Sequence, residues 1–95
     1  MRAILPSGAC NAHCHVFGPR DVFPYAPDAA FVPRHNAPKK ALYTLNDTIN
    51  LSRCVVVQST CHGFDNRVCE DAVAGRPRDY RAIALLRPDV ADAEL

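Results

Sequence analysis

The sequence predicts an α/β fold in which three parallel strands alternate with two helices. Two runs, RCVVVQS (53–59) and YRAIALL (80–86), are too apolar for strands that have one face in water. Such runs are typical of parallel strands buried on both faces. Between the strands lie segments whose apolar residues recur at helical spacing. This alternation is typical of a parallel sheet with right-handed crossovers.

The first element is an expected strand, ACNAHCH (9–15), in which small and polar residues alternate. A first helix is expected from about Pro38, which suits a first helical turn, to about Leu51. Its apolar stripe consists of Leu42, Leu45 and Ile49.

The second helix is expected after GFDN (63–66), with Asp65 as its N-cap and Gly75 and Pro77 at its end. The strand at 80–86 follows. After Pro88, DVADAEL predicts the opening turn of a third helix.

Residues 18–37 are expected to form a long loop, because the density of proline excludes a helix or a central strand. Loops of about 20 residues in compact domains are usually functional. Its prolines are Pro19, Pro24, Pro27 and Pro33.

Three buried parallel strands cannot be a whole sheet, because the outer strands would present long apolar edges to water. A complete TIM (β/α)8 barrel needs about 250 residues. We therefore expect residues 1–95 to be an incomplete TIM barrel, an N-terminal fragment with the first three strands and two intervening helices.

Charge and composition exclude several classes of function. The formal net charge is +1, and no basic stripe is present, so nothing favours binding to nucleic acid or to an anionic membrane. The apolar N-terminal stretch, residues 1–5, is far shorter than a signal peptide or a membrane span. We expect a cytoplasmic protein.

The five cysteines are odd in number, which disfavours a disulfide scaffold. Their spacing also lacks the C-x-x-C pairs typical of structural zinc sites. Free, buried thiols are the expected state.

His13 and His15 are the first candidate catalytic residues. Residues two apart in a strand point to one face, so both imidazoles are expected at the carboxyl end of the first strand, facing the barrel interior where catalytic groups collect. Such a pair can bind a divalent metal or, without one, stabilise a developing oxyanion.

The second candidate is QSTCHGFDN (58–66), which follows the second strand at the same end. Ser59 and Thr60 offer hydroxyl groups and His62 a titratable ring, and the backbone N–H groups of residues 63–66 offer an anion site. The alternative is structural: His62 is satisfied by neighbouring groups. A Cys61–His62 nucleophile pair is disfavoured because no third residue is evident to orient it.

The stretches CNAHCHVFGP, FPYAPD, VVVQSTCHGFDNR and DVADAEL resemble, in order and spacing, the N-terminal third of the 2-pyrone-4,6-dicarboxylate lactonase family. This family belongs to the amidohydrolase superfamily and has TIM barrels. The resemblance implies a hydrolase that opens a carboxylated lactone in the breakdown of lignin-derived aromatic compounds.

The resemblance also implies roles for single residues. His13 and His15 would polarise the lactone carbonyl without a metal, and Thr60 would hold a substrate carboxylate. Phe31 stands where such enzymes present a tyrosine to the substrate, which leaves open which acid is bound. The family's aspartate base on the last strand, its further histidine and its arginines have no counterpart in these residues, so we expect the fragment to be inactive alone.

Two alternatives remain open. A metal-dependent amidohydrolase, acting on another lactone or on an amide, would hold Zn²⁺ or Mn²⁺ on His13 and His15. A non-catalytic module would instead self-associate through its open sheet.

Overall fold

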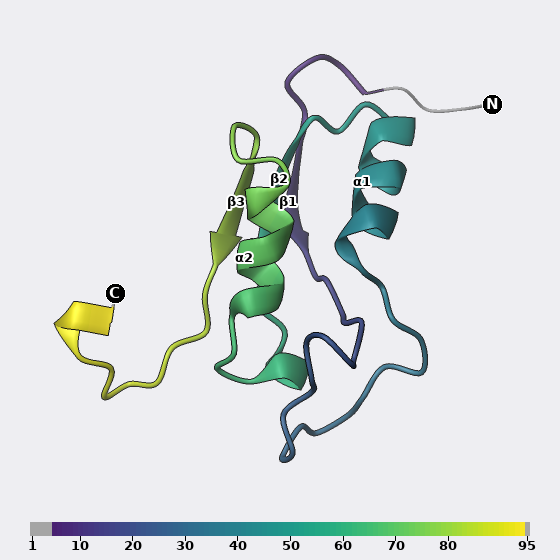
Figure 1. Ribbon diagram of the computed structural model, residues 1–95. Helices are drawn as coiled ribbons and strands as arrows, with labels where there is room; N and C mark the ends of the chain where they lie inside the picture. Colours follow the sequence, from purple (N-terminus) through teal and green to yellow (C-terminus); the bar gives the residue numbers. More distant parts are fainter. Residues whose placement is uncertain (1–4, 95) are drawn as a thin grey trace.

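The computed structural model describes residues 5–94 and shows the predicted order of elements (Figure 1). Its parallel sheet has the strand order β1 (Cys10–Cys14), β2 (Arg53–Val57), β3 (Tyr80–Ile83). The connections hold two α-helices and a 3₁₀ turn: α1 (Lys39–Thr48), η1 (Thr60–His62) and α2 (Arg67–Ala74). A second 3₁₀ turn, η2 (Asp92–Glu94), follows β3. The predicted fold class, three parallel strands with two intervening helices, is confirmed. No helix in the described part of the chain is long and apolar enough to cross a bilayer.

The hydrophobic core lies between the two helices and one face of the sheet. Full burial of one large apolar side chain is worth about 1.5–3 kcal/mol relative to exposure. The core cluster consists of Val16, Leu42, Cys54, Val56, Val68, Cys69, Ala72 and Tyr80. Both helices therefore cover the same face of the sheet.

The opposite face of the sheet is covered by no helix within residues 5–94, and Ile83 at the end of β3 is 56% exposed. The prediction that the strand beginning at Tyr80 is buried on both faces is therefore wrong for this part of the chain. The reason is visible in Figure 1, where η2 lies away from the sheet and covers neither its open face nor its outer edge.

A buried asparagine joins three elements. Asn46 of α1 is fully buried, and its Nδ2 donates to the Tyr80 hydroxyl of β3 at 2.9 Å. Its Oδ1 accepts from Asn11 Nδ2 of β1 at 3.3 Å. A buried amide in these positions is stable only because its donor and acceptor are both satisfied.

The ends of the two helices are joined by a stacked ion pair. Arg76 donates to both carboxylate oxygens of Asp47 at 2.6 and 2.8 Å, and these bonds lower the pKa of Asp47 below its ordinary value of 3.8. The guanidinium carbon lies 4.3 Å from the centre of the Tyr43 ring. The Tyr43 hydroxyl donates to the Ala72 carbonyl and lies against Gly75, where a Cβ atom would collide with it. Gly75 is therefore needed for close approach.

Strands β2 and β3 end earlier than predicted, at Val57 and Ile83 rather than at residues 59 and 86. The reason is that the following residues bond to side chains and turns instead of continuing the ladder. Ser59 accepts a hydrogen bond inside η1, and both backbone polar groups of Leu85 bond to the side chain of Asn66.

Helix α2 begins one residue later than the predicted cap implies. Its N-cap is Asn66, which makes no side-chain capping bond. Asp65, the predicted cap, accepts from the backbone N–H of Arg67 at 3.3 Å and forms an ion pair with the guanidinium of that residue. Its carboxylate thus stays at the start of the helix, paired with a side chain.

The long proline-rich loop predicted at 18–37 is confirmed, and it is closed at its base. Phe17 and Ala37 exchange two backbone hydrogen bonds of 2.9 and 2.8 Å in an isolated bridge. The loop and η1 lie together beyond the end of the sheet to which the strand arrows point (Figure 1). This is the end at which ligands bind in parallel α/β folds.

Replacing Asn46 by Ala should lower the free energy of unfolding by about 2–3 kcal/mol, because the substitution leaves the buried Tyr80 hydroxyl and the Asn11 amide without partners. Urea denaturation followed by circular dichroism measures this. The control is Leu45→Ala on the same helix, where the side chain is 58% exposed and the change should stay within about 0.5 kcal/mol. Equal effects of the two substitutions would show that the asparagine network contributes nothing.

Candidate functional site

The two candidate catalytic histidines lie side by side. The ring centres of His13 and His15 are 5.2 Å apart in an edge-to-face arrangement, and both side chains are exposed. His13 lies in β1 and His15 directly follows it, on the face of the sheet that no helix covers. The expectation that the two rings share one face at the carboxyl end of the strand is confirmed.

A bulge in β1 turns Asn11 away from the face that carries the two histidines. The register advances from Asn11 opposite Cys54 to Cys14 opposite Val56, so that three steps along β1 match two along β2. As a result Asn11 and Cys14 both face the helices, where Asn11 bonds to α1 and the Cys14 sulfur lies 3.1 Å from that of Cys54. In a regular strand Asn11 would share a face with the histidines. Bulges often redirect side chains next to active sites.

The ring of His15 is held by the neighbouring strand. Its Nδ1 lies 2.8 Å from the carbonyl oxygen of Val57, the last residue of β2. A carbonyl oxygen only accepts, so Nδ1 carries the proton and donates it. The bond leaves Nε2 as the ring atom available to a substrate or a metal, an arrangement common among functional histidines.

A hollow of about 750 Å³ opens beside η1. Three segments converge on it, each following a different strand: the proline-rich loop, the η1 segment and the chain after β3. Its walls carry a threonine hydroxyl, two aromatic rings, a guanidinium and two carboxylates, supplied by Thr60, Tyr25, Phe64, Arg87, Asp28 and Asp65. This volume and mixed lining suit a small, polar organic molecule.

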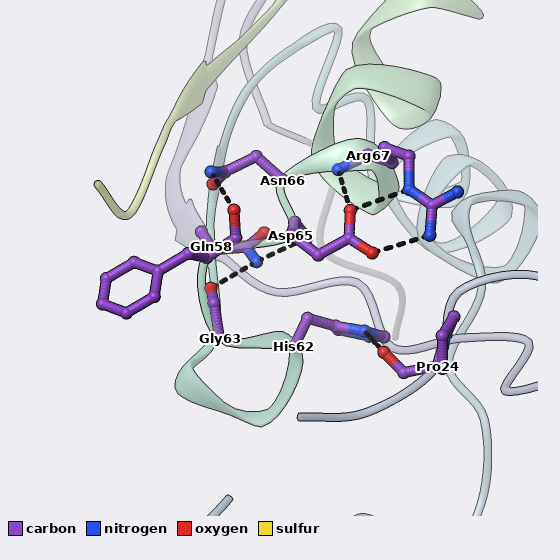
Figure 2. Close-up of polar contacts among 8 residues, drawn as sticks. Pro24, Gln58, His62, Gly63, Asp65, Asn66 and Arg67 are labelled. Carbon is purple, nitrogen blue, oxygen red and sulfur yellow. Dashed lines mark hydrogen bonds and ion pairs between the residues drawn. The ribbon is translucent and has the colours of Figure 1, made fainter. Parts of the chain in front are cut away.

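The η1 segment is held in place by two amide side chains (Figure 2). Gln58 donates from Nε2 to the carbonyl oxygens of Gly63 and Asp65 at 3.0 and 2.9 Å. Asn66 donates to Leu85 O at 3.0 Å and accepts from Leu85 N at 2.9 Å, which ties the chain after β3 to the same segment. Side chains therefore fix this wall of the hollow without regular secondary structure.

His62 is buried at the junction of η1 and the loop, with 2% of its surface exposed. Its Nε2 accepts from Gly18 N at 3.2 Å, and its Nδ1 lies 3.2 Å from Pro24 O. Figure 2 shows the ring directed at Pro24. The ring centre lies 4.8 Å from that of Tyr25 and 6.5 Å from that of Phe17.

The other predicted site residues are separated by the structure. Thr60 is exposed on the hollow, as expected for a ligand-binding hydroxyl. Ser59 is buried, and its Oγ accepts from the backbone N–H of Cys61, so it caps η1. The ring of Phe31 is 59% exposed and does not line the hollow, although its carbonyl accepts from the Cys61 thiol.

The predicted backbone anion site at residues 63–66 is wrong for two of its donors. The N–H groups of Gly63 and Asp65 already donate to the carbonyls of Thr60 and His62. These two N–H groups form the i to i+3 hydrogen bonds of η1 and of the turn after it, so they are not available to an anion.

The cysteines are free, and Cys54, Cys61 and Cys69 are buried as predicted, whereas Cys10 is exposed and Cys14 is half-buried. Burial raises the pKa of Cys14 to about 12 and that of Cys69 to about 11. Since the thiolate is the nucleophile and the metal ligand, these thiols are inert at neutral pH. Cys61 is fully buried with its thiol donated to Phe31 O, which disfavours a nucleophilic role.

The described residues contain no complete set of metal ligands. Among residues 5–94, no group of three or more His, Cys, Asp or Glu side chains is placed to hold one ion. The His13 and His15 pair could contribute two imidazole ligands, whereas structural and catalytic zinc sites use three or four protein ligands. A metal would therefore need further ligands from outside the described residues.

Sequence reasoning missed two residues of the hollow. Arg87 reads as a solvated arginine near a strand end, and Phe64 as part of a turn, yet both line the hollow. The Arg87 guanidinium carbon lies 5.9 Å from the centre of the Phe64 ring. Their positions in the sequence could have indicated this, because residues that follow parallel strands gather at one end of the sheet.

Comparison with known proteins places these residues in context. The model of a family described as amidohydrolase matches residues 10–95. The chain is 47% identical over 91 residues to a 2-pyrone-4,6-dicarboxylate hydrolase of Comamonas testosteroni, covering 96% of this chain and 30% of that protein. It is 37% identical over 84 residues to a 4-sulfomuconolactone hydrolase of Rhizobium radiobacter, covering 88% and 27%.

Among solved structures, a probable 2-pyrone-4,6-dicarboxylic acid hydrolase of Acinetobacter baumannii superposes with a TM-score of 0.82 at 23% identity. The match covers 90% of this chain and 32% of that one, and it supports the fold. The chain thus spans about a third of the length of the relatives it matches.

Proposed function

The chain belongs to the amidohydrolase family, and on this premise we propose that it supplies the N-terminal part of the active site of a lactone hydrolase. The substrate proposed is a carboxylated lactone of the 2-pyrone-4,6-dicarboxylate type, opened by water during the breakdown of lignin-derived aromatic compounds. The observation that carries the proposal is the pair of adjacent imidazoles of His13 and His15 at the carboxyl edge of the sheet. The names of the similar hydrolases support the substrate class.

In this proposal His13 and His15 stabilise the negative charge that develops on the lactone carbonyl oxygen when water attacks. Preorganised donors aimed at such an oxyanion are often the largest single contribution to catalysis. Because the Nδ1–H of His15 is already donated to Val57 O, only Nε2 of this ring can face the carbonyl oxygen. The bond also keeps the ring from rotating.

The hollow beside η1 is proposed to hold an acidic group of the substrate. Thr60 offers a hydroxyl donor, and Arg87, which also pairs with Asp89, supplies a guanidinium. The same walls carry the carboxylates of Asp28 and Asp65, and Asp65 is neutralised by its ion pair with Arg67. Of the remaining candidates, Phe31 is proposed to contact the substrate only through a movement of the loop, because its ring now faces solvent. Ser59 is proposed to act through η1, which it caps.

A metal-dependent amidohydrolase is the second candidate. It is favoured by the hydrogen bond between His15 Nδ1 and the Val57 carbonyl, because a metal-binding imidazole usually donates its other ring N–H to such a group. His13 and His15 would hold the ion, which would supply Lewis-acid polarisation of the carbonyl. Assay of an active preparation with and without a chelator, together with metal analysis, distinguishes the two: activity that survives chelation supports the metal-free proposal.

A non-catalytic assembly module is the third candidate, and the exposed Ile83 on the open face of the sheet favours it. Self-association through that face would bury this side chain. Size-exclusion chromatography of the chain tests this, since a monomer at high concentration contradicts assembly.

The catalytic roles can be tested in a chimaera in which residues 10–95 replace the matching segment of the Comamonas testosteroni hydrolase. We expect the chimaera to open 2-pyrone-4,6-dicarboxylate, measured as loss of pyrone absorbance. His15→Asn should lower kcat about 10²- to 10³-fold, because the amide keeps a donor for Val57 O but lacks the Nε2 group. His13→Asn should have a loss of similar size.

The control for these substitutions is His35→Asn, at an exposed position in the proline-rich loop, which should leave kcat unchanged. Full activity of both the His13 and His15 variants would contradict the proposed role of the pair. An inactive chimaera that folds would contradict the substrate class.

Substitution of Thr60 tests the hollow. Thr60→Val in the same chimaera should lower kcat/KM at least about tenfold, because a hydrogen bond to a charged group is worth about 1.5–3 kcal/mol. Thr60→Ser should retain most of the activity. Thr44→Val, at an exposed position on α1, is the matched control. A Thr60→Val variant with unchanged kcat/KM would show that the hydroxyl does not contact the substrate.

A further inference from the structure

We propose that His62 is a positioning residue that fixes the proline-rich loop at 18–37 against η1, through one defined tautomer that accepts from Gly18 and donates to Pro24. The sequence left two roles open for His62, as a substrate ligand or as a structural residue satisfied by neighbouring groups. The structure favours the second, because both ring nitrogens bond to the backbone of the loop. The claim that the fixed loop shapes a substrate site rests on the proposed function. The hydrogen bonds by which His62 holds the loop do not depend on that function.

The tautomer follows from the two partners. The Gly18 amide can only donate, so Nε2 must present its lone pair. The Pro24 carbonyl can only accept, so Nδ1 must carry the proton. With the side chain 2% exposed, no polar atom of the ring remains for a substrate without breaking one of these bonds.

The backbone at Gly18 strengthens this restraint. Gly18 has a φ of +66°, which side chains rarely adopt, and a Cβ atom there would lie 2.6 Å from Asn36 Oδ1 and 2.8 Å from Arg20 N. The amide that His62 accepts from is thus held in one direction by its own loop. Asn36 also accepts from the Tyr25 hydroxyl at 3.4 Å, which connects the two sides of the loop.

Two aromatic neighbours of the His62 ring link the hollow to the catalytic pair. Tyr25, at 4.8 Å between ring centres, lines the hollow together with Pro24. Phe17, stacked at 6.5 Å, forms the base of the loop and lies 5.9 Å from the ring of His15. One buried ring therefore sets the position of a hollow wall and of the residue packed against His15.

Two further contacts join the loop to η1 next to His62. Ala26 N donates to Cys61 O at 2.7 Å, and the Cys61 thiol donates to Phe31 O at 3.3 Å. These bonds fix the middle of the loop, whereas those of His62 fix its first part. Loss of the His62 bonds should therefore loosen residues 18–25 selectively.

The test uses the full 95-residue chain and three substitutions. His62→Gln places an acceptor near Nε2, His62→Asn places a donor near Nδ1, and His62→Phe keeps the aromatic stacking but neither hydrogen bond. The readouts are the ¹⁵N chemical shifts of the His62 ring in the unmodified chain, and amide hydrogen exchange of Gly18 in each variant.

We expect the ring shifts of a neutral imidazole protonated at Nδ1. We also expect Gly18 exchange to accelerate about tenfold in His62→Phe and His62→Asn, and less in His62→Gln, because one hydrogen bond restrains that amide. Exchange of Ala26 should change little in all three. This pattern separates hydrogen-bond positioning from simple filling of space, which would affect the Gln and Asn variants alike.

A ring protonated at Nε2 in the unmodified chain, or equal Gly18 exchange in the Gln and Asn variants, would overturn the proposal. The ring measurement needs no substitution, so it decides even if a variant does not fold. In the chimaera, His62→Phe should raise KM for 2-pyrone-4,6-dicarboxylate and lower kcat. The factor by which KM rises should be at least about three times the factor by which kcat falls. A chimaera without activity would count against the proposed function, while the exchange and ring data would still test His62.

Discussion

The parallel pairing of β1 with β2, with its bulge between Asn11 and Cys14, is the constraint on which the site depends. It sends Asn11 and Cys14 to the helix face, where the first joins the Asn46 network and the second lies against Cys54. It leaves the two histidines on the open face and brings the end of β2 within 2.8 Å of the His15 ring. In a regular strand, Asn11 would lie on the same face as His13 and His15 and could not bond to Asn46 of α1.

Beyond the ends of the strands, side chains rather than strand pairing satisfy the backbone hydrogen-bonding groups. Gln58, Asn66 and His62 satisfy backbone groups of the turns and loops at the carboxyl end of the sheet. A net hydrogen bond contributes only about 0.5–1.5 kcal/mol, but a buried group left unpaired costs about 1–3 kcal/mol. The three side chains therefore act less as stabilisers than as restraints that exclude other loop conformations.

The site has two parts with different chemistry. The imidazole pair on the sheet offers nitrogen donors or ligands, and the hollow beside η1 offers a hydroxyl, aromatic rings and charged groups of both signs. The stack from His15 through Phe17 to His62 and Tyr25 connects the two. The carboxylated lactone that we propose as the substrate also has its reacting carbonyl and its acidic group at different positions. This substrate class agrees with the lactone hydrolases that the chain resembles.

The order of strands and helices, the loop at 18–37, the shared face of His13 and His15, and the family could all be predicted from the sequence. These follow from periodicity, proline content and local motifs, which act over a few residues. The bulge, the burial of His62, the internal bond of Ser59 and the outward ring of Phe31 could be seen only in the folded chain. Each depends on a partner or a packing environment that local patterns do not encode: His62 bonds to Gly18, which lies 44 residues earlier. Hydrogen-bond partners at that separation are chosen by how the elements dock, so residue type alone shows the candidates but not their roles.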